Sequence, residues 1–94
     1  MNLTRDRAET IGLQAVAWLA ADGELLPVFM GATGASEADF RAGLGDPAFQ
    51  ASVLDFILME DAWVQAFCAA HDLRPDTPMR VRAVLPGGEQ VHWT

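Results

Sequence analysis

Hydrophobic residues recur every three or four positions along most of this chain, and polar capping residues separate the runs. The first run forms one face of a helix, because this spacing matches the helical repeat. Its apolar positions are Ala8, Ile11, Ala15, Trp18 and Leu19. Thr4 precedes the run and can cap free backbone N–H groups, and Asp22-Gly23 interrupts it. The pattern predicts a first helix that begins at Thr4 and ends before Asp22.

Two shorter helices are predicted next. Residues 25–30 are apolar, with Pro27 in the first turn, where a missing N–H costs little. Gly31 and Gly34 are expected to close this helix, because glycine accepts the left-handed conformation of helix ends. Ser36-Glu37-Ala38-Asp39 then combines a capping hydroxyl with acids, as is typical of a helix start.

Asp46-Pro47 marks the clearest boundary, an N-cap followed by proline at the first helical position. Residues 47–59 are apolar on nearly every side, which predicts a helix that is buried all round or shared with a partner. Asp61 is expected to cap a fifth helix that ends near His71-Asp72. Asp76-Thr77-Pro78 is expected to start a last short helix through Leu85.

The last segment has a second interpretation. Apolar residues alternate with Arg80 and Arg82 over residues 79–85, and Pro86-Gly87-Gly88 would turn the chain towards Val91 and Trp93. Alternation and a glycine turn are the two signals of a β-hairpin. We favour the helix, because an internal repeat aligns this segment with a segment of the first half that is itself predicted to be a helix.

The repeat emerges when the chain is shifted by 38 residues. Trp18 then falls on Phe56 and Phe29 on Phe67, and with three further residues Arg41 falls on Arg82. Any two amphipathic helices set in phase would give part of this match. If the repeat is real, units 8–45 and 46–88 are related by a pseudo-twofold axis, and residues 89–94 form a tail. The sequence thus predicts one all-α domain over residues 1–94, a small bundle of five to six helices with two duplicated helix–helix–short-helix units.

Composition supports this fold class and restricts the partners. Ninety-four residues suffice for one domain, and sixteen are alanine, the strongest helix former. The net charge of −7 disfavours nucleic acids and anionic membranes as partners. No run approaches the roughly 18 apolar residues of a membrane span. Positive charge gathers near the C-terminal end, which makes Arg74, Arg80 and Arg82 the candidate partner-binding residues, for an acidic partner.

The sequence contains few candidates for catalytic residues. Cys68 is the single cysteine, so no intramolecular disulfide forms, which fits a reducing cytosol. The N-terminus does not have the pattern of a signal peptide, so a cytoplasmic location is expected. His71 lies three residues from Cys68, a spacing that pairs a thiol with a base. The apolar position beside Phe67, however, predicts an inert buried thiol. A small enzyme around Cys68 and His71 is therefore the second alternative.

No cofactor or metal is expected. His71-Asp72 resembles the metal-binding pair of helical phosphohydrolases, but such sites need several more ligands, and the only other histidine is His92. The acid pairs lie at predicted helix starts, where they stabilise the dipole.

The first alternative is a nucleic-acid-associated regulator. Residues 25–44 read as a helix-turn-helix, with Glu37, Asp39 and Arg41 exposed on the second helix. Two acids facing a DNA groove are unfavourable. In this alternative Arg74, Arg80 and Arg82 would make the contact.

Several stretches resemble a known family. They are residues 8–15, Trp18-Leu19-Ala20, Glu24-Leu25-Leu26 with Phe29, residues 45–49, residues 53–56 and Leu85-Pro86-Gly87-Gly88. Together they resemble a family of small alphaproteobacterial proteins described only as a domain of unknown function. The resemblance implies a bacterial cytosolic protein and carries no functional residues. The expected function is a non-catalytic protein-interaction or regulatory module, whose partner is another protein or a second copy of itself.

Overall fold

The computed structural model describes residues 3–85, and all regular elements in that range are helices. They are α1 (Arg5–Ala21), α2 (Leu25–Thr33), α3 (Glu37–Gly43), α4 (Pro47–Ile57), α5 (Asp61–His71) and α6 (Thr77–Val84). The all-α class is confirmed, and α6 is a helix where alternation had allowed a strand. The predictions on the tail, including Val91, His92 and Trp93, lie outside the described residues.

Three of the six helix starts follow from the capping residues seen in the sequence. The hydroxyl of Thr4 accepts from the Arg7 N–H at 3.0 Å. Ser36 and Asp39 form a reciprocal capping box, with distances of 3.2 and 2.8 Å. The Asp46 carboxylate accepts from the Ala48 N–H at 3.1 Å. The first four free N–H groups of each helix need such acceptors, which is why these polar residues set the boundaries.

Two boundary predictions were wrong in detail. The N-cap of α5 is Glu60, which makes no side-chain capping bond, and Asp61 is already helical. Gly31 lies inside α2, which ends three residues later at Gly34 with φ of 79°. Only Gly34 takes the left-handed conformation, so it alone closes the helix.

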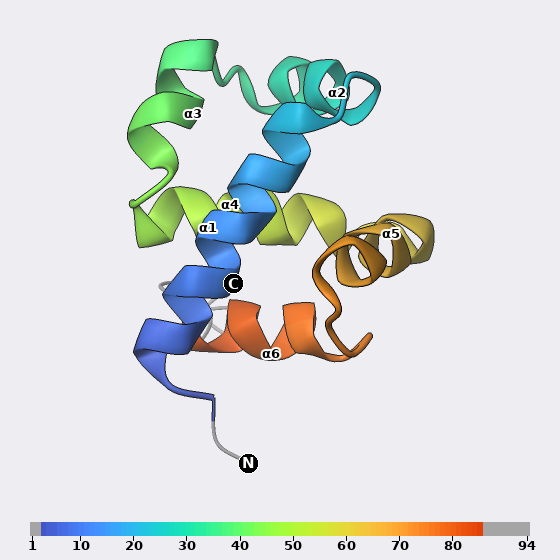
Figure 1. Ribbon diagram of the computed structural model, residues 1–94. Helices are drawn as coiled ribbons and strands as arrows, with labels where there is room; N and C mark the ends of the chain where they lie inside the picture. The colour runs from blue at the N-terminus through green and yellow to red at the C-terminus, as the bar shows by residue number, and fades with distance from the viewer. Residues whose placement is uncertain (1–2, 86–94) are drawn as a thin grey trace, which may run out of the picture.

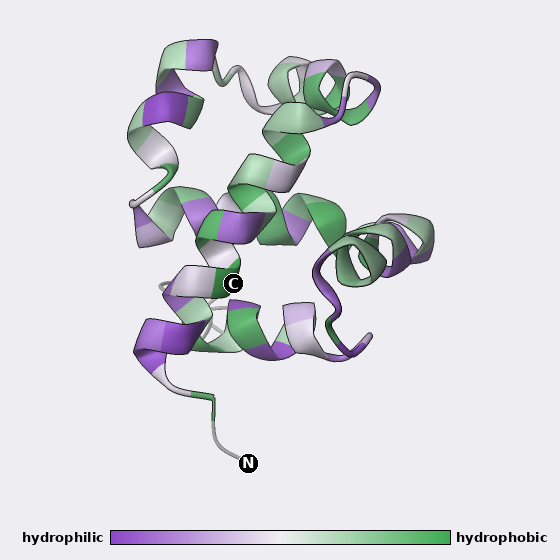
Figure 2. Ribbon diagram, in the orientation of Figure 1, coloured by the Kyte–Doolittle hydropathy of each residue, from purple (hydrophilic) through white to green (hydrophobic). Residues whose placement is uncertain are grey.

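Helices α1 and α4 cross at the centre, and the other four helices surround them (Figure 1). Helices α2 and α3 lie at one end of the crossing, and α5 and α6 lie at the other (Figure 1). Each of the two short helices, α3 and α6, contacts both α1 and α4. Hydrophobic residues concentrate along α4, while the first turn of α1 and the α5–α6 loop are hydrophilic (Figure 2).

The apolar helix α4 is covered by its own chain. It packs against α1, α3, α5 and α6, which bury most of its residues. The buried ones are Gln50, Ala51, Val53, Leu54, Phe56 and Ile57. Ser52 and Asp55 face solvent. The apolar residues of α4 are thus covered by four of the other five helices, which is the first of the two alternatives that the sequence offered.

Phe29 and Phe67 occupy corresponding places in the two halves. Both are buried, at 1% and 0% exposure. Phe29 packs edge to face on Phe56 of α4, with ring centroids 5.2 Å apart. Phe67 packs edge to face on Trp18 of α1, with centroids 5.6 Å apart. Since Trp18 and Phe56 also correspond, these are the reciprocal contacts expected of two halves about a pseudo-twofold axis. The duplication itself stays a prediction, which superposition of residues 16–34 on residues 54–72 would test.

Within residues 3–85, no single helix is both long and apolar enough to cross a membrane. Helices α1 and α2 reach that length and composition only when taken together, and they meet at an angle of 107°.

Candidate functional site

A pocket lined by arginines lies where the start of α1 meets the α5–α6 loop and α6. Its volume is about 260 Å³. We call it the arginine pocket, and it is lined by Leu3, Arg7, Ile11, Asp72, Leu73, Arg74, Thr77 and Arg80. Three arginines and one aspartate thus line a hollow with partly apolar walls. The charge around this pocket is therefore positive, although the net charge of the chain is −7.

The loop that carries Arg74 is held by the end of α5. The Cys68 thiol donates to the backbone carbonyl of Arg74 at 3.3 Å. The N–H of Leu73 donates to the carbonyl of Cys68 at 2.8 Å. Asp72, the C-cap of α5, takes the left-handed conformation with φ of 55°. These bonds place Arg74 beside α6 while its side chain stays 85% exposed.

Arg74 makes a weak ion pair within the chain. The Nε atom of Arg74 lies 3.7 Å from Asp76 Oδ1, a loose and solvent-exposed pair. Thr77 places the start of α6 at the pocket wall, and the start of a helix carries partial positive charge. Asp72 is the one acidic lining residue. The pocket can therefore attract an anionic group that also has apolar parts.

The structure brings together two of the three arginines that the sequence analysis singled out. Arg74 and Arg80 line the arginine pocket. Arg82 points to α4 instead, where its Nε and Nη2 donate to the two carboxylate oxygens of Asp55 at 2.6 and 3.2 Å. Its side chain is 18% exposed, so this pair fastens α6 to α4.

Arg7 joins the pocket although the sequence analysis did not single it out. It lies 67 positions before Arg74 in the sequence. Helix α1 reaches α6 only through tertiary packing. No local pattern could have signalled that contact.

Cys68 and His71 do not form a nucleophile–base pair. The thiol is directed to the Arg74 carbonyl, and the His71 ring packs on Phe67 with centroids 5.1 Å apart. Burial raises the pKa of the Cys68 thiol above its ordinary value, and the nearby carboxylate of Asp76 raises it further. A catalytic cysteine needs the opposite shift, because the thiolate is the nucleophile.

We therefore expect Cys68 to resist thiol reagents in the folded protein. The side chain is 4% exposed and protonated at neutral pH. Labelling with Ellman's reagent should be at least about a hundredfold slower in buffer than in 6 M guanidinium, since it requires local or global opening. Labelling at the same rate in both conditions would revive the thiol-enzyme alternative.

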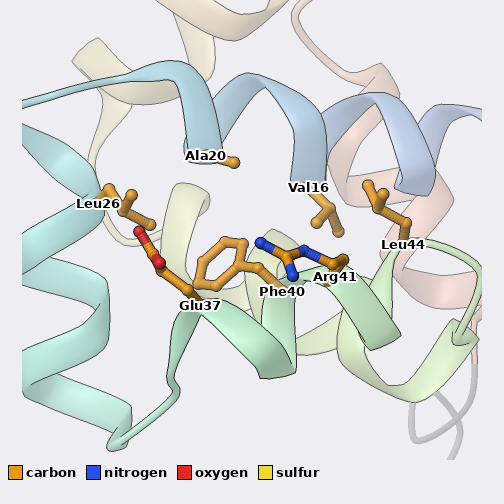
Figure 3. A pocket seen from close by; sticks show the side chains of 7 residues that line it. All are labelled: Val16, Ala20, Leu26, Glu37, Phe40, Arg41 and Leu44. Carbon is orange, nitrogen blue, oxygen red and sulfur yellow. The ribbon is translucent and has the colours of Figure 1, made fainter.

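A second hollow, which we call the α1–α3 groove, lies between α1, α2 and α3 (Figure 3). Its volume is about 260 Å³, and it is lined by Val16, Ala20, Leu26, Glu37, Phe40, Arg41 and Leu44. The guanidinium of Arg41 extends across the groove, and Glu37 points towards Leu26 (Figure 3). No ion pair of Arg41 with a carboxylate occurs within residues 3–85.

The region read as a helix-turn-helix gives no support to DNA contact. Glu37 and Asp39 are both exposed on α3, and the Asp39 carboxylate is engaged in the capping box with Ser36. The exposed Arg41 extends across the groove (Figure 3). Within the described range, no three His, Cys, Asp or Glu side chains gather in a group that could hold a metal ion.

Comparison with known proteins identifies the family and leaves its chemistry open. Residues 5–88 match the family model described as "Protein of unknown function (DUF3572)". No curated protein and no solved structure matches the chain.

Proposed function

Because the chain belongs to the DUF3572 family of proteins of unknown function, we propose a function from its own geometry. The protein is a non-catalytic interaction module that binds an acidic, partly apolar segment of another protein at the arginine pocket. The observation that carries the proposal is the convergence of Arg7, Arg74 and Arg80 on one hollow of an otherwise acidic chain.

Guanidinium groups suit this role because they bind carboxylates through two parallel hydrogen bonds. Leu3, Ile11 and Leu73 offer apolar surface beside those charges, so aliphatic side chains of the same segment can be buried. The acidic surface elsewhere on the chain repels the partner, which favours one orientation of approach.

The test is binding of a fluorescein-labelled peptide, Glu-Leu-Glu-Glu repeated three times, followed by fluorescence anisotropy at low salt. We expect the triple variant Arg7→Ser, Arg74→Ser, Arg80→Ser to bind at least about tenfold more weakly than the wild type, since each lost contact costs a charge-assisted hydrogen bond. Asp72→Asn should bind a few times more tightly, because asparagine tolerates the left-handed conformation and removes the opposing carboxylate.

The control is a variant with the same charge change elsewhere. Met59→Glu combined with Ala62→Glu and Gln65→Glu lowers the net charge by the same three units at exposed residues outside the pocket, and binding should change by less than about twofold at 150 mM salt, where distant charges are screened. Equal weakening in both variants would reduce the effect to net charge and overturn the proposal.

Two other results would replace the proposal. Binding of duplex DNA at low salt to the wild type, but not to the triple variant, would support the nucleic-acid alternative. A homodimer in light scattering that becomes a monomer in the triple variant would mean that the partner is a second copy.

We also propose that the protein acts in the cytoplasm of a bacterium. The support is the single buried thiol of Cys68, which suits a reducing compartment, and the resemblance to alphaproteobacterial proteins. Cell fractionation that recovers the protein with the periplasm would contradict it.

A further inference from the structure

The α1–α3 groove has a counterpart in the second half of the chain, where the residue corresponding to Leu44 is fully buried. Under the shift that aligns α1 with α4, Val16 corresponds to Leu54. Under the shift that aligns α3 with α6, Phe40 corresponds to Val81 and Leu44 to Leu85. Val16 and Phe40 are buried like their counterparts, at 0% and 6% exposure. The difference lies at the third pair, because Leu85 is 0% exposed and Leu44 is only partly buried. The contact of α4 with α6 can therefore be compared, residue by residue, with the contact of α1 with α3.

Two side chains of the second half have no equivalent on α1. In the second half, Asp55 of α4 pairs with Arg82 of α6, and Leu58 at the end of α4 packs against the core. The corresponding positions on α1 are Ala17 and Ala20. Helix α1 therefore offers two methyl groups where α4 offers a carboxylate and a leucine.

Ala17 supplies no carboxylate for Arg41, and Ala20 offers only a methyl group to the groove. Arg41 corresponds to Arg82 but meets no carboxylate within residues 3–85, and Ala20 forms part of the wall. Glu37 does not neutralise Arg41: its carboxylate points towards Leu26, and it belongs to the first turn of α3, where a negative charge stabilises the helix (Figure 3).

From this comparison we propose that the α1–α3 groove docks a helical segment of a partner protein. That segment carries an Asp or Glu followed three residues later by a leucine-sized aliphatic residue. The carboxylate pairs with Arg41, and the aliphatic side chain fills the space beside Ala20 and Phe40. The spacing is that of Asp55 and Leu58, which puts both side chains on one face of a helix. This site is separate from the arginine pocket and does not depend on the function proposed there.

The test uses a fluorescein-labelled peptide that copies residues 47–60 and so presents Asp55 and Leu58. In the matched control peptide both residues are replaced by alanine, as on α1. We expect the first peptide to bind the wild-type protein at least about tenfold more tightly than the control, a difference of one ion pair and one buried side chain. Arg41→Ala should weaken the first peptide about fivefold and leave the control peptide unchanged.

A second variant supplies the missing side chains within the chain itself. Ala17→Asp combined with Ala20→Leu should close the groove, abolish peptide binding and raise Tm by about 5 °C, because an ion pair and apolar packing are added. Adding Arg41→Ala to that double variant should remove part of the increase in Tm.

The results of these experiments distinguish a partner segment in the groove from a second copy of the chain. Equal binding of the two peptides, or binding that Arg41→Ala leaves unchanged, would overturn the proposal. So would a double variant that binds as well as the wild type. A wild-type dimer in light scattering that Ala17→Asp with Ala20→Leu converts to a monomer would identify the occupant as a second copy and overturn the partner assignment.

Discussion

Replacing Phe29 with alanine should remove about 3–5 kcal/mol from the free energy of unfolding, the usual cost of emptying a buried phenylalanine site. The ring is 1% exposed and lies at the centre of an aromatic cluster. It makes edge-to-face contacts with Phe40, Phe49 and Phe56, at centroid distances of 5.4, 6.1 and 5.2 Å. These rings come from α3 and α4, so the cavity would weaken the packing of α2 and α3 against α4.

Urea unfolding followed by circular dichroism measures this loss. The control is Val28→Ala in the same helix, since Val28 is 51% exposed and its change should cost less than about 0.5 kcal/mol. A small domain has a stability of about 5–9 kcal/mol, so Phe29→Ala leaves little margin for folding. Phe29→Leu, at a cost of about 1–2 kcal/mol, keeps the comparison measurable. A Phe29 variant no less stable than Val28→Ala would contradict the account of the core.

Gly12→Ala should destabilise the protein by about 1–3 kcal/mol, although alanine is the better helix former. A Cβ atom at Gly12 would lie 2.5 Å from Gln50 Oε1, at the contact of α1 with α4. Gln50 cannot move aside easily, because it is 2% exposed and its Nε2 donates to the Leu44 carbonyl at 2.8 Å. The substitution would therefore push the two central helices apart.

Gly31→Ala is the matched control. Gly31 lies inside α2 with open space around its Cα, so alanine should stabilise the protein by about 0.5–1 kcal/mol through helix propensity alone. In a Gln50→Ala background Gly12→Ala should cost much less, because the obstacle is gone. Chemical denaturation of the four variants measures both effects. A Gly12→Ala variant stabilised as much as Gly31→Ala would show that the helices do not approach this closely.

The sequence was sufficient for the features that depend on neighbouring residues. The caps at Thr4, Ser36 and Asp46 were predicted because a side-chain oxygen meets N–H groups two or three positions away. Apolar periodicity likewise predicted the buried face of α1, at Ala8, Ile11, Ala15 and Leu19. The cap of α5 was misplaced by one residue, because Glu60 and Asp61 offer the same chemistry and only the backbone distinguishes them.

Features that join distant segments were not predicted. Arg82 was grouped with Arg74 and Arg80 by sequence distance, but Asp55, 27 positions earlier, holds it. Arg7 joins the arginine pocket only because α1 packs on α6. Periodicity assigns residues to faces of a helix and does not say which face meets which neighbour. For that reason the fold class was predictable from the chain and the composition of the pocket was not.

The most direct test of the arginine pocket is the spectrum of the arginine side chains themselves. Their Nε–Hε resonances can be recorded by ¹H–¹⁵N NMR while the Glu-Leu-Glu-Glu peptide is added. Our account expects the signals of Arg7, Arg74 and Arg80 to shift together and saturate at one peptide concentration, while Arg82, held by Asp55, stays unchanged. Shifts spread evenly over all six arginines, or no shift at the three pocket arginines, would contradict it.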